Sequence, residues 1–382
     1  APTALKFVRT RSFLAALEAT EIPFVTVVSA LRMKDGREAV VMSAEIELGQ
    51  EPKVPIQRRE SIAVVFSEGD DTYPEVLSLR DDFPQVPHLN CRDEDYPKSL
   101  CLYEDSWPEV KLRWTPTGFI QRIRDWFALT AEGRLHGDDQ PLEPILSGSP
   151  WRLVLPSDLF NAALSSKPEP LIVSRTSDDM QNAVLVAQRP GATPQRAPQF
   201  MATTFLTAAQ QHGVIRKRPK SLAELAAVMH TCASDLIGEL RDRLMAWDRE
   251  AIRRLHLLLV VYFPKTRSLG GPVETRDIWS FAVEGTVETL GQKLGLWEVT
   301  NGYIATLLAP DLNRTGQDVA IDVLNTSFAL SRSQAAVLNG VSPSTVKIVA
   351  IGAGALGSQI IPKLIQSGFG QWTIIDDDRL LP

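Results

Sequence analysis

The sequence predicts three consecutive parts: an α+β domain over residues 1–150, with helices flanking an antiparallel strand meander, an α/β middle domain over 151–341, and the opening βαβ unit of a further α/β domain over 342–382. Two observations carry this prediction. The Asp35-Gly36 pair between two β-branched runs is a strong hairpin signal. A Gly-x-Gly-x-x-Gly pattern that begins at Gly352 lies between an apolar strand pattern and an apolar helix pattern. The 382 residues are enough for two or three domains.

Composition places the chain among ordinary globular proteins, since 44% of its residues are hydrophobic and 23% are charged. The net charge of −6 does not favour binding to nucleic acid or to an anionic membrane surface. No apolar run reaches the length of a membrane-spanning helix, and the amino end shows no secretory leader pattern. We therefore expect a cytoplasmic protein that binds neither nucleic acid nor membranes. The basic run at residues 214–221 is interpreted as a solvated linker.

The first domain is predicted element by element from its hydrophobic pattern. The apolar pattern over residues 5–21 predicts an amphipathic opening helix. The two strands of the Asp-Gly hairpin follow, and the run SIAVVFSE at residues 61–68 predicts a third strand. Thr115 as the N-cap and Pro116 at the first helical position predict a second long helix, which ends at Gly133.

Residues 73–108 are rich in proline and show no helical or alternating pattern. A loop of this length inside a compact domain is usually functional, and this one holds Cys91 and Cys101. No Cys-x-x-Cys pair occurs, which argues against a thiolate zinc finger or a disulfide framework and favours a reducing compartment. The histidines show no metal-ligand spacing, so no metal site is predicted. Cys232 falls in a helical pattern and is interpreted as part of the core.

The middle domain shows helical and strand patterns in turn. Residues 221–255 have a strongly helical pattern, and residues 256–267 predict a buried strand with a polar exit. The polar stretch at residues 188–200 is predicted to be an exposed loop. Helices and strands thus share this region, which predicts an α/β domain.

The glycine pattern near the carboxyl end has the spacing of a nucleotide-binding turn. Gly352 permits the tight turn, Gly354 lets the backbone approach a phosphate, and Gly357 lets the helix pack close to the strand. The helix amino terminus adds unpaired N–H groups and a partial positive charge that attract the anion. The next strand pattern, residues 371–378, ends in aspartates at the spacing where a carboxylate reaches ribose hydroxyls. The pattern therefore predicts nucleotide binding rather than a merely structural turn.

Residues 346–378 also resemble the start of the adenylating family that includes ubiquitin-activating enzymes and ThiF-like sulfur-carrier adenylyltransferases. The resemblance implies a Rossmann-like adenylation domain that binds ATP with Mg²⁺ and forms a homodimer. The site residues that it implies are Gly352, Gly354, Gly357, Asp376 and Asp378. Other site residues of that family do not occur before Pro382. The resemblance thus implies an incomplete ATP site and a chain that is the N-terminal portion of a longer protein.

A second resemblance lies in the first domain. It rests on Tyr73-Pro74, the run PHLN at Pro87–Asn90, the run SLCL at Ser99–Leu102, Trp107 and the helix that begins near Pro116. In this order they resemble ubiquitin-conjugating enzymes, in which a proline-rich loop, a His-Pro-Asn-like motif, a cysteine, a tryptophan and a long helix follow a strand meander. This chain lacks the central proline of that motif, and its asparagine stands eleven residues before the cysteine.

The resemblance implies that Cys101 carries a protein's carboxyl terminus as a thioester, because such transfer needs a thiolate on an accessible loop. Asn90 is the implied amide that stabilises the thioester oxygen or holds the loop that does. His88 completes the implied site, with a structural role favoured over that of a base. Cys91 competes as nucleophile but lacks the apolar residues that flank Cys101. The alternative for Cys101 is a buried core position.

Three further side chains are placed near the predicted site. His136 follows the long helix and either faces the same cleft or takes a surface or turn position. Glu104 and Asp105 follow the cysteine directly, and an anion there would disfavour its thiolate.

A conjugating-type domain followed by an adenylating-type domain resembles the bacterial fusion proteins of antiphage operons, notably those that accompany cyclic-oligonucleotide signalling (CBASS). They imply ATP-dependent adenylation of a carboxyl terminus, transfer to Cys101 and ligation to an amine. The implied partner is a cGAS-like nucleotidyltransferase or a ubiquitin-like protein. Two other functions stay open, namely an NAD-dependent oxidoreductase that uses the glycine loop, and a non-catalytic scaffold with a conjugating fold.

Overall fold

The computed structural model describes residues 5–19, 22–69, 71–92, 94, 96–103, 105, 107–137, 139–142, 149–159, 170–176, 183–191, 197–213, 215, 217–268 and 270–376. The chain divides into two compact units, Ala1–Gly148 with Thr204–Val323, and Ser149–Thr203 with Leu324–Pro382. Two strands, β9 (Phe200–Leu206) and β15 (Ile321–Phe328), each pass from one unit into the other. The domain boundaries expected near residues 150 and 341 stay predictions.

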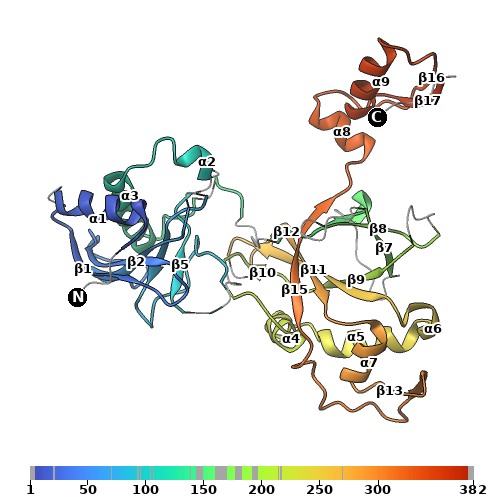
Figure 1. Cartoon of the computed structure of the whole chain (residues 1–382), viewed down its shortest axis with the longest axis horizontal. Coiled ribbons are helices and arrows are strands. Elements are labelled where there is room, and N and C mark those ends of the chain that lie inside the picture. The colour runs from blue at the N-terminus through green and yellow to red at the C-terminus, as the bar shows by residue number, and fades with distance from the viewer. Residues whose placement is uncertain are drawn as a thin grey trace. The chain divides into compact units, whose positions relative to one another are not determined.

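The amino-terminal part of the first unit is an antiparallel sheet with helices beside it (Figure 1). Its strands stand in sequence order, β1 (Val25–Arg32), β2 (Glu38–Glu45), β3 (Arg59–Phe66), β4 (Glu75–Ser78) and β5 (Lys98–Leu100). Every neighbouring pair is antiparallel. The helices are α1 (Val8–Ala19), α2 (Trp107–Val110) and α3 (Pro116–Ala131). The predicted α+β meander with flanking helices is confirmed for this part of the chain.

The β1–β2 hairpin turns where the sequence predicts it. Gly36 has φ of +90°, in the region that favours glycine. The Asp35 carboxylate accepts hydrogen bonds from the backbone N–H of Arg37 (3.1 Å) and from its Nε (2.8 Å). The side-chain bond from Arg37, followed by the backbone bond, lowers the pKa of Asp35. The turn is thus closed by hydrogen bonds between its own residues.

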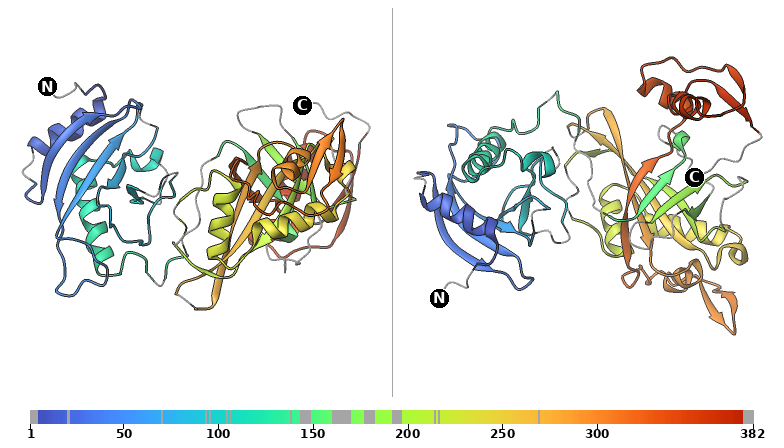
Figure 2. Two further views of the ribbon diagram at one scale, coloured as in Figure 1. Left: turned by 90° about the horizontal axis from the view of Figure 1, so that it is seen from below. Right: turned by 45° about the horizontal axis from the view of Figure 1, so that its top comes forward.

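One sheet face, α1 and α3 together form the core of this part, and α3 runs along that face (Figure 2). Alternate residues of β2 and β3 point into it, as the two-residue strand period requires. Five large apolar residues of α3 are at most 4% exposed, namely Phe119, Ile120, Ile123, Trp126 and Phe127. Each such side chain stabilises the fold by roughly 1.5–3 kcal/mol on burial. This packing fixes α3, which supports the site described below.

Two local differences from the predicted elements have physical causes. The opening helix begins at Val8, and the backbone N–H of Phe7, which has no partner inside the helix, donates to the Glu38 carboxylate (3.1 Å). The proline-rich loop contains β4, β5 and α2, each of only three or four residues. Elements this short depend on their neighbours for hydrogen bonds, so they leave no periodic signal in the sequence.

The second part of the first unit combines helices and strands. Its strands are β10 (Gln210–Gln211), β11 (His256–Thr266), β12 (Val273–Val283) and the hairpin β13 (Trp297–Thr300) with β14 (Tyr303–Thr306). β11 pairs antiparallel with β12 and parallel with β10. Its helices are α4 (Leu222–Thr231), α5 (Leu236–Ala246), α6 (Arg249–Ile252) and α7 (Val287–Lys293). The helical pattern at 221–255 is interrupted because Ala233 has φ of +53°, and Asp235 and Asp248 each cap a new helix.

The second unit holds a mixed sheet and a βαβ unit. β6 (Arg152–Leu155) is parallel to β8 (Val184–Gln188) and to the end of β15, and β7 (Leu171–Arg175) is antiparallel to β8 and β9. The elements η1 (Ser157–Leu159) and α8 (Arg332–Leu338) complete it. The strands β16 (Lys347–Ile351) and β17 (Gln371–Ile375) pair in parallel on either side of α9 (Gly357–Gln366). The βαβ order is therefore present, and the adenylation domain that it would open stays a prediction. Among the described helices, none is both long and apolar enough to cross a membrane.

We predict that Thr115→Ala loosens the first turn of α3. The Thr115 hydroxyl accepts a hydrogen bond from the N–H of Gly118 at 3.2 Å, and loss of an N-cap costs about 1 kcal/mol. Amide exchange in residues 117–119, followed by mass spectrometry, should accelerate roughly fivefold. Thr117→Ala, at an exposed position of the same turn, is the control and should change little. Equal acceleration in both variants would contradict the cap.

Candidate active site

Cys101 is positioned by a short antiparallel pairing. Leu89 forms an isolated antiparallel bridge with Leu100, the last residue of β5. The N–H of Cys101 donates to the carbonyl of His88 at 2.8 Å, next to this bridge. Leu89 and Leu100 are each 3% exposed and belong to the core. Because successive strand side chains point to opposite faces, His88 and Cys101 share the other face as cross-strand neighbours.

Cys101 and His88 both line a cavity of about 590 Å³. This volume lies within the range of small-molecule sites. One side of the cavity comes from α3, and the rest comes from His88 before β5 and from the segments that follow β5 and α3. The polar and charged residues of its lining, apart from the cysteine and its tyrosine neighbour, are His88, Asp105, Gln121, Arg122, Asp125 and Gln140. The half-buried cysteine is thus presented at a polar depression rather than sealed in the core.

Arg122 contacts the chain segment immediately after Cys101. Its Nη1 donates to the carbonyl of Leu102 at 2.6 Å, and its guanidinium lies 4.5 Å from the ring centre of Tyr103. The Tyr103 ring stacks on Tyr73, with 5.3 Å between their centres. Burial raises the pKa of Tyr103, against the opposing effect of the Arg122 charge, so its hydroxyl stays neutral near pH 7. These contacts hold the segment after Cys101 without adding an anion.

Two carboxylates of the cavity have partners that orient them. Asp105 forms an ion pair with Arg113, and Asp125 accepts a hydrogen bond from Gln121 at 2.7 Å. Apart from the cysteine and its tyrosine neighbour, the charged and titratable side chains of the lining are thus these two carboxylates, the Arg122 guanidinium and the His88 imidazole. Glu104, the other acidic residue predicted near the cysteine, lies outside the described residues.

His88 has φ of +55°, in the left-handed region that non-glycine residues seldom adopt. Its Nε2 lies 3.2 Å from Nδ1 of His136, which follows α3 in the chain. The centre of the His136 ring lies 4.6 Å from that of His212. Of the two positions that the sequence left open for His136, the structure has the one beside the site, in contact with His88.

Asn90 is bound to β5 rather than placed in the cavity lining. Its Nδ2 donates to Oγ of Ser99 and to the carbonyl of Leu100, both at 3.0 Å, and its N–H donates to the Ser99 carbonyl at 2.8 Å. Its side chain is exposed and does not line the cavity of Cys101. These bonds tie the His88–Asn90 segment to the strand before the cysteine, and the predicted effect on the thioester oxygen stays a prediction.

The other two cysteines have different surroundings. Cys91 is half-buried and does not line the Cys101 cavity. Cys232 lies at the end of α4 and is 2% exposed, in agreement with the core position expected for it. Burial raises the pKa of the Cys232 thiol, opposed by a hydrogen bond with Thr231. Of the three cysteines, only Cys101 belongs to the described lining of this polar cavity.

The glycine loop has the conformation that its sequence predicts. Gly352 has φ of +79°, and α9 begins after Leu356 without a side-chain cap. The Asp376 carboxylate, just after β17, accepts a hydrogen bond from the N–H of Ala353 in the loop. This bond joins the ends of the two strands. Asp378, the second predicted carboxylate, lies outside the described residues.

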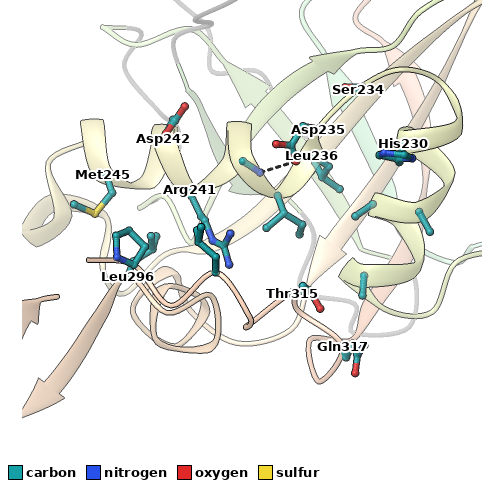
Figure 3. A pocket seen from close by; sticks show the side chains of 17 residues that line it. His230, Ser234, Asp235, Leu236, Arg241, Asp242, Met245, Leu296, Thr315 and Gln317 are labelled. Carbon is teal, nitrogen blue, oxygen red and sulfur yellow. Dashed lines mark hydrogen bonds between the residues drawn. The ribbon is translucent and has the colours of Figure 1, made fainter. Parts of the chain in front are cut away.

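A second cavity, of about 710 Å³, lies between α4, α5 and residues 310–317 (Figure 3). Alanines of α4 line it, and two of its charged residues have structural bonds. Asp235 accepts from the N–H of Gly238 at 2.9 Å as the N-cap of α5. Arg241 donates to three backbone carbonyls at 2.8–3.2 Å. None of its lining residues is a cysteine, so we take the Cys101 cavity as the candidate active site.

Comparison with known families agrees with this choice. Residues 19–165 match the model of prokaryotic E2 family A. The matched segment contains the five-stranded sheet, the pairing at Leu89 and Leu100, Cys101 and α3, and covers less than half of the 382 residues. It supports a bacterial E2-like domain, a family that suggests ubiquitin-like conjugation. No curated protein matches the chain.

Several residues of the cavity were not predicted from the sequence. Gly118, Gln121, Arg122 and Asp125 follow the i, i+3, i+4, i+7 spacing of one helix side. That spacing is a signal for a shared surface. Only the folded chain shows that this side of α3 faces Cys101. The Tyr103–Tyr73 stack had no signal, because sequence spacing does not indicate which aromatic rings meet.

We predict that iodoacetamide modifies Cys101 faster than Cys232 in the folded chain. Alkylation needs an accessible thiolate, and burial of Cys232 both hides its thiol and raises its pKa. The rates, read from cysteine-containing peptides by mass spectrometry at pH 8, should differ by at least about tenfold. The two rates should converge in concentrated urea. Equal rates in the folded chain would contradict the assigned positions.

Proposed function

We propose that the E2-like domain carries the carboxyl terminus of a protein as a thioester on Cys101 and transfers it to an amine. The observation that supports this most directly is the position of the cysteine. Cys101 directly follows β5 next to His88, lines a polar cavity and lies inside the segment that matches a prokaryotic E2 family. A thiol in this setting is reachable by a large acyl donor while its backbone stays fixed.

The chemistry consists of two acyl transfers. In the first, the Cys101 thiolate attacks an activated carboxyl terminus, forms the C–S bond and expels the activating group. In the second, an amine attacks the thioester carbon, forms the C–N bond and releases the thiolate. The pairing of residues 88–90 with β5 keeps the sulfur at one position through both steps. The proposal therefore requires one fixed nucleophile and space for two successive substrates.

We propose that ATP with Mg²⁺ supplies the activation at the glycine loop, in an adenylation domain that forms a homodimer. The parallel β16–α9–β17 unit, the positive φ of Gly352 and the Asp376 bond to the loop support a nucleotide-binding turn. The same turn also suits NAD, so an oxidoreductase is the second candidate for this unit. Asp376 belongs to both proposals, because each places a carboxylate after the second strand.

The partner that we propose is a protein with a free carboxyl terminus, either a cGAS-like nucleotidyltransferase or a ubiquitin-like protein. The setting that we propose is bacterial antiphage defence in the cytoplasm. The support for both is the order of a conjugating-type domain and an adenylating-type βαβ unit in one chain. A non-catalytic scaffold is the alternative for the E2-like domain, and it would not need a reactive Cys101.

We predict that Cys101→Ser changes the chemistry of a covalent adduct. Full-length protein, isolated from its own cells in acid, should show a heavier band that thiol reductants remove, because a thioester is labile to thiols. In Cys101→Ser the adduct should become an oxygen ester, which resists thiols but is cleaved by hydroxide. The measurement is a gel run with and without reductant, with the band mass determined by mass spectrometry.

Cys91→Ser is the matched control for this experiment, since Cys91 is also half-buried and in the same loop. It should keep the thiol-sensitive band. A band that survives in Cys101→Ser as a thiol-sensitive species, or that disappears in Cys91→Ser, would remove Cys101 as the acceptor.

We predict that Gly354→Ala weakens nucleotide binding without unfolding the loop. A methyl group at Gly354 meets no atom within 4 Å, and its φ lies outside the positive region, so the folded loop accepts it. The same methyl stands where the backbone would approach a phosphate. Calorimetry on the full-length protein should show binding of ATP with Mg²⁺ and a loss of roughly tenfold or more in the variant. Binding of NAD instead would favour the oxidoreductase, and unchanged affinity would reject the phosphate approach.

A further inference from the structure

We infer that His88 accepts a proton from the acceptor amine as it attacks the Cys101 thioester, and that His136 positions His88 for this role. The inference rests on the proposed function and deepens it. It assigns a base and a positioning residue to the second transfer. It also defines the acceptor as an amine that arrives protonated.

The first argument is the register of the paired segment. His88 stands opposite Cys101 across the antiparallel pairing, where the Cα atoms of facing residues lie about 4.5–5.5 Å apart. Both side chains line the same cavity, and the Cys101 N–H to His88 carbonyl bond of 2.8 Å fixes their spacing. An amine that reaches a thioester carbon on Sγ is therefore within the reach of the imidazole. A general base has to meet this geometric condition first.

The backbone of His88 gives the second argument. A non-glycine residue in the left-handed region costs on the order of 1–3 kcal/mol and persists only where the surroundings fix it. His88 has φ of +55°, held by the pairing of its neighbour Leu89 with Leu100. This conformation places the ring in the same cavity lining as Cys101 and at 3.2 Å from His136. The conformational cost at His88 is thus linked to the ring orientation that the proposed base needs.

His136 sets the proton position on His88. Nε2 of His88 and Nδ1 of His136 lie 3.2 Å apart, so one nitrogen donates and the other accepts. When His136 accepts, the His88 proton stays on Nε2, and Nδ1 is the basic nitrogen assigned to the incoming amine. The imidazolium that forms keeps the same bond to His136. This is the role that a carboxylate has in a nucleophile–histidine–acid triad, filled here by a second histidine.

The step balances as follows. An alkyl amine such as the side chain of lysine has a pKa near 10.4 and arrives as an ammonium ion at neutral pH. Forming the amide removes two protons from its nitrogen. The first goes to Nδ1 of His88 and then to water, which exposes the lone pair that forms the bond to the thioester carbon. The C–S bond breaks, the electron pair leaves on the Cys101 sulfur, and that sulfur takes the second proton to become a thiol. No oxidant, reductant or metal is needed.

The charged and titratable groups around the pair come from several elements. Asp105 after β5 and Asp125 on α3 are the carboxylates of the cavity, and Arg122 on α3 is its guanidinium. His212 lies beside His136, and Arg267 donates to two backbone carbonyls just after His136, at 3.1 and 2.9 Å. The carboxylates favour both the ammonium ion that enters and the imidazolium that forms. Arg267 holds the segment that carries His136.

The test separates charging from transfer by means of a synthetic acyl donor. The full chain is incubated with the diglycine thioester of mercaptoethanesulfonate, and acylation of Cys101 is followed by mass spectrometry. The acylated protein is then mixed with either free lysine or hydroxylamine between pH 6 and 10. Lysine must lose a proton during attack, whereas hydroxylamine is already unprotonated at neutral pH and does not need a base.

His88→Asn is the main variant, because asparagine tolerates the left-handed backbone and has no basic nitrogen. Charging and hydroxylamine cleavage should remain near the wild-type rates. Lysine transfer at pH 7 should fall by roughly a hundredfold, the lower range of general base catalysis, and the deficit should shrink toward pH 10. His136→Leu should lower lysine transfer as well. His136→Asn should restore much of it, because an amide oxygen can accept the His88 Nε2 proton.

Three outcomes would overturn the inference. An equal loss with lysine and hydroxylamine in His88→Asn would indicate lost packing instead of a lost base. If Cys101 in His88→Asn is acylated more slowly by the same factor, His88 would act on the Cys101 thiol and not on the amine. Unchanged lysine transfer would leave it a structural residue. A separate result, in which iodoacetamide modifies wild-type Cys101 but the thioester does not acylate it, would count against the proposed function itself.

Discussion

The pairing of residues 88–90 with 99–101 is the constraint on which the rest of the site depends. Two backbone hydrogen bonds of 2.8 Å flank the Leu89–Leu100 bridge, and both leucines are anchored in the core. Without this pairing, the chain between β4 and β5 would be a long loop with many conformations, and ordering it for any reaction would cost entropy. With it, Cys101, the adjacent histidine and the Asn90 bonds are fixed by one local register.

Helix α3 holds the shape of the cavity beside the paired segments 88–90 and 99–101. The helix begins at a capped residue, packs aromatic side chains into the core on one side, and presents Arg122 and Asp125 to the cavity on the other. Arg122 then holds the chain after Cys101 by its bond to the Leu102 carbonyl. A functional site is most precise when its residues stand on elements that are themselves fixed by packing. The hydrophobic pattern of α3 is therefore also the reason that the cysteine has a defined environment.

The features that the sequence predicted are those determined by local chemistry. Gly36 in the turn and Thr115 at the cap act within four residues of themselves, so their patterns were sufficient. Cys101 was found through the order of neighbouring motifs. β5 was missed, because three residues become a strand only when β4 pairs with them. The contact between His88 and His136 joins positions 48 residues apart, a distance at which periodicity carries no information.

The charges of the cavity act differently on the two chemical states of the cysteine. A carboxylate beside a thiolate disfavours the thiolate, and Asp105 and Asp125, bonded to Arg113 and Gln121, share the cavity lining with Cys101. A thioester carries no charge, so the same carboxylates would not oppose the acylated state of the proposed function. Under that proposal, the cavity opposes the acylated cysteine less than the free thiolate, and the His88–His136 pair lies beside the position where the proposed amine would lose its proton.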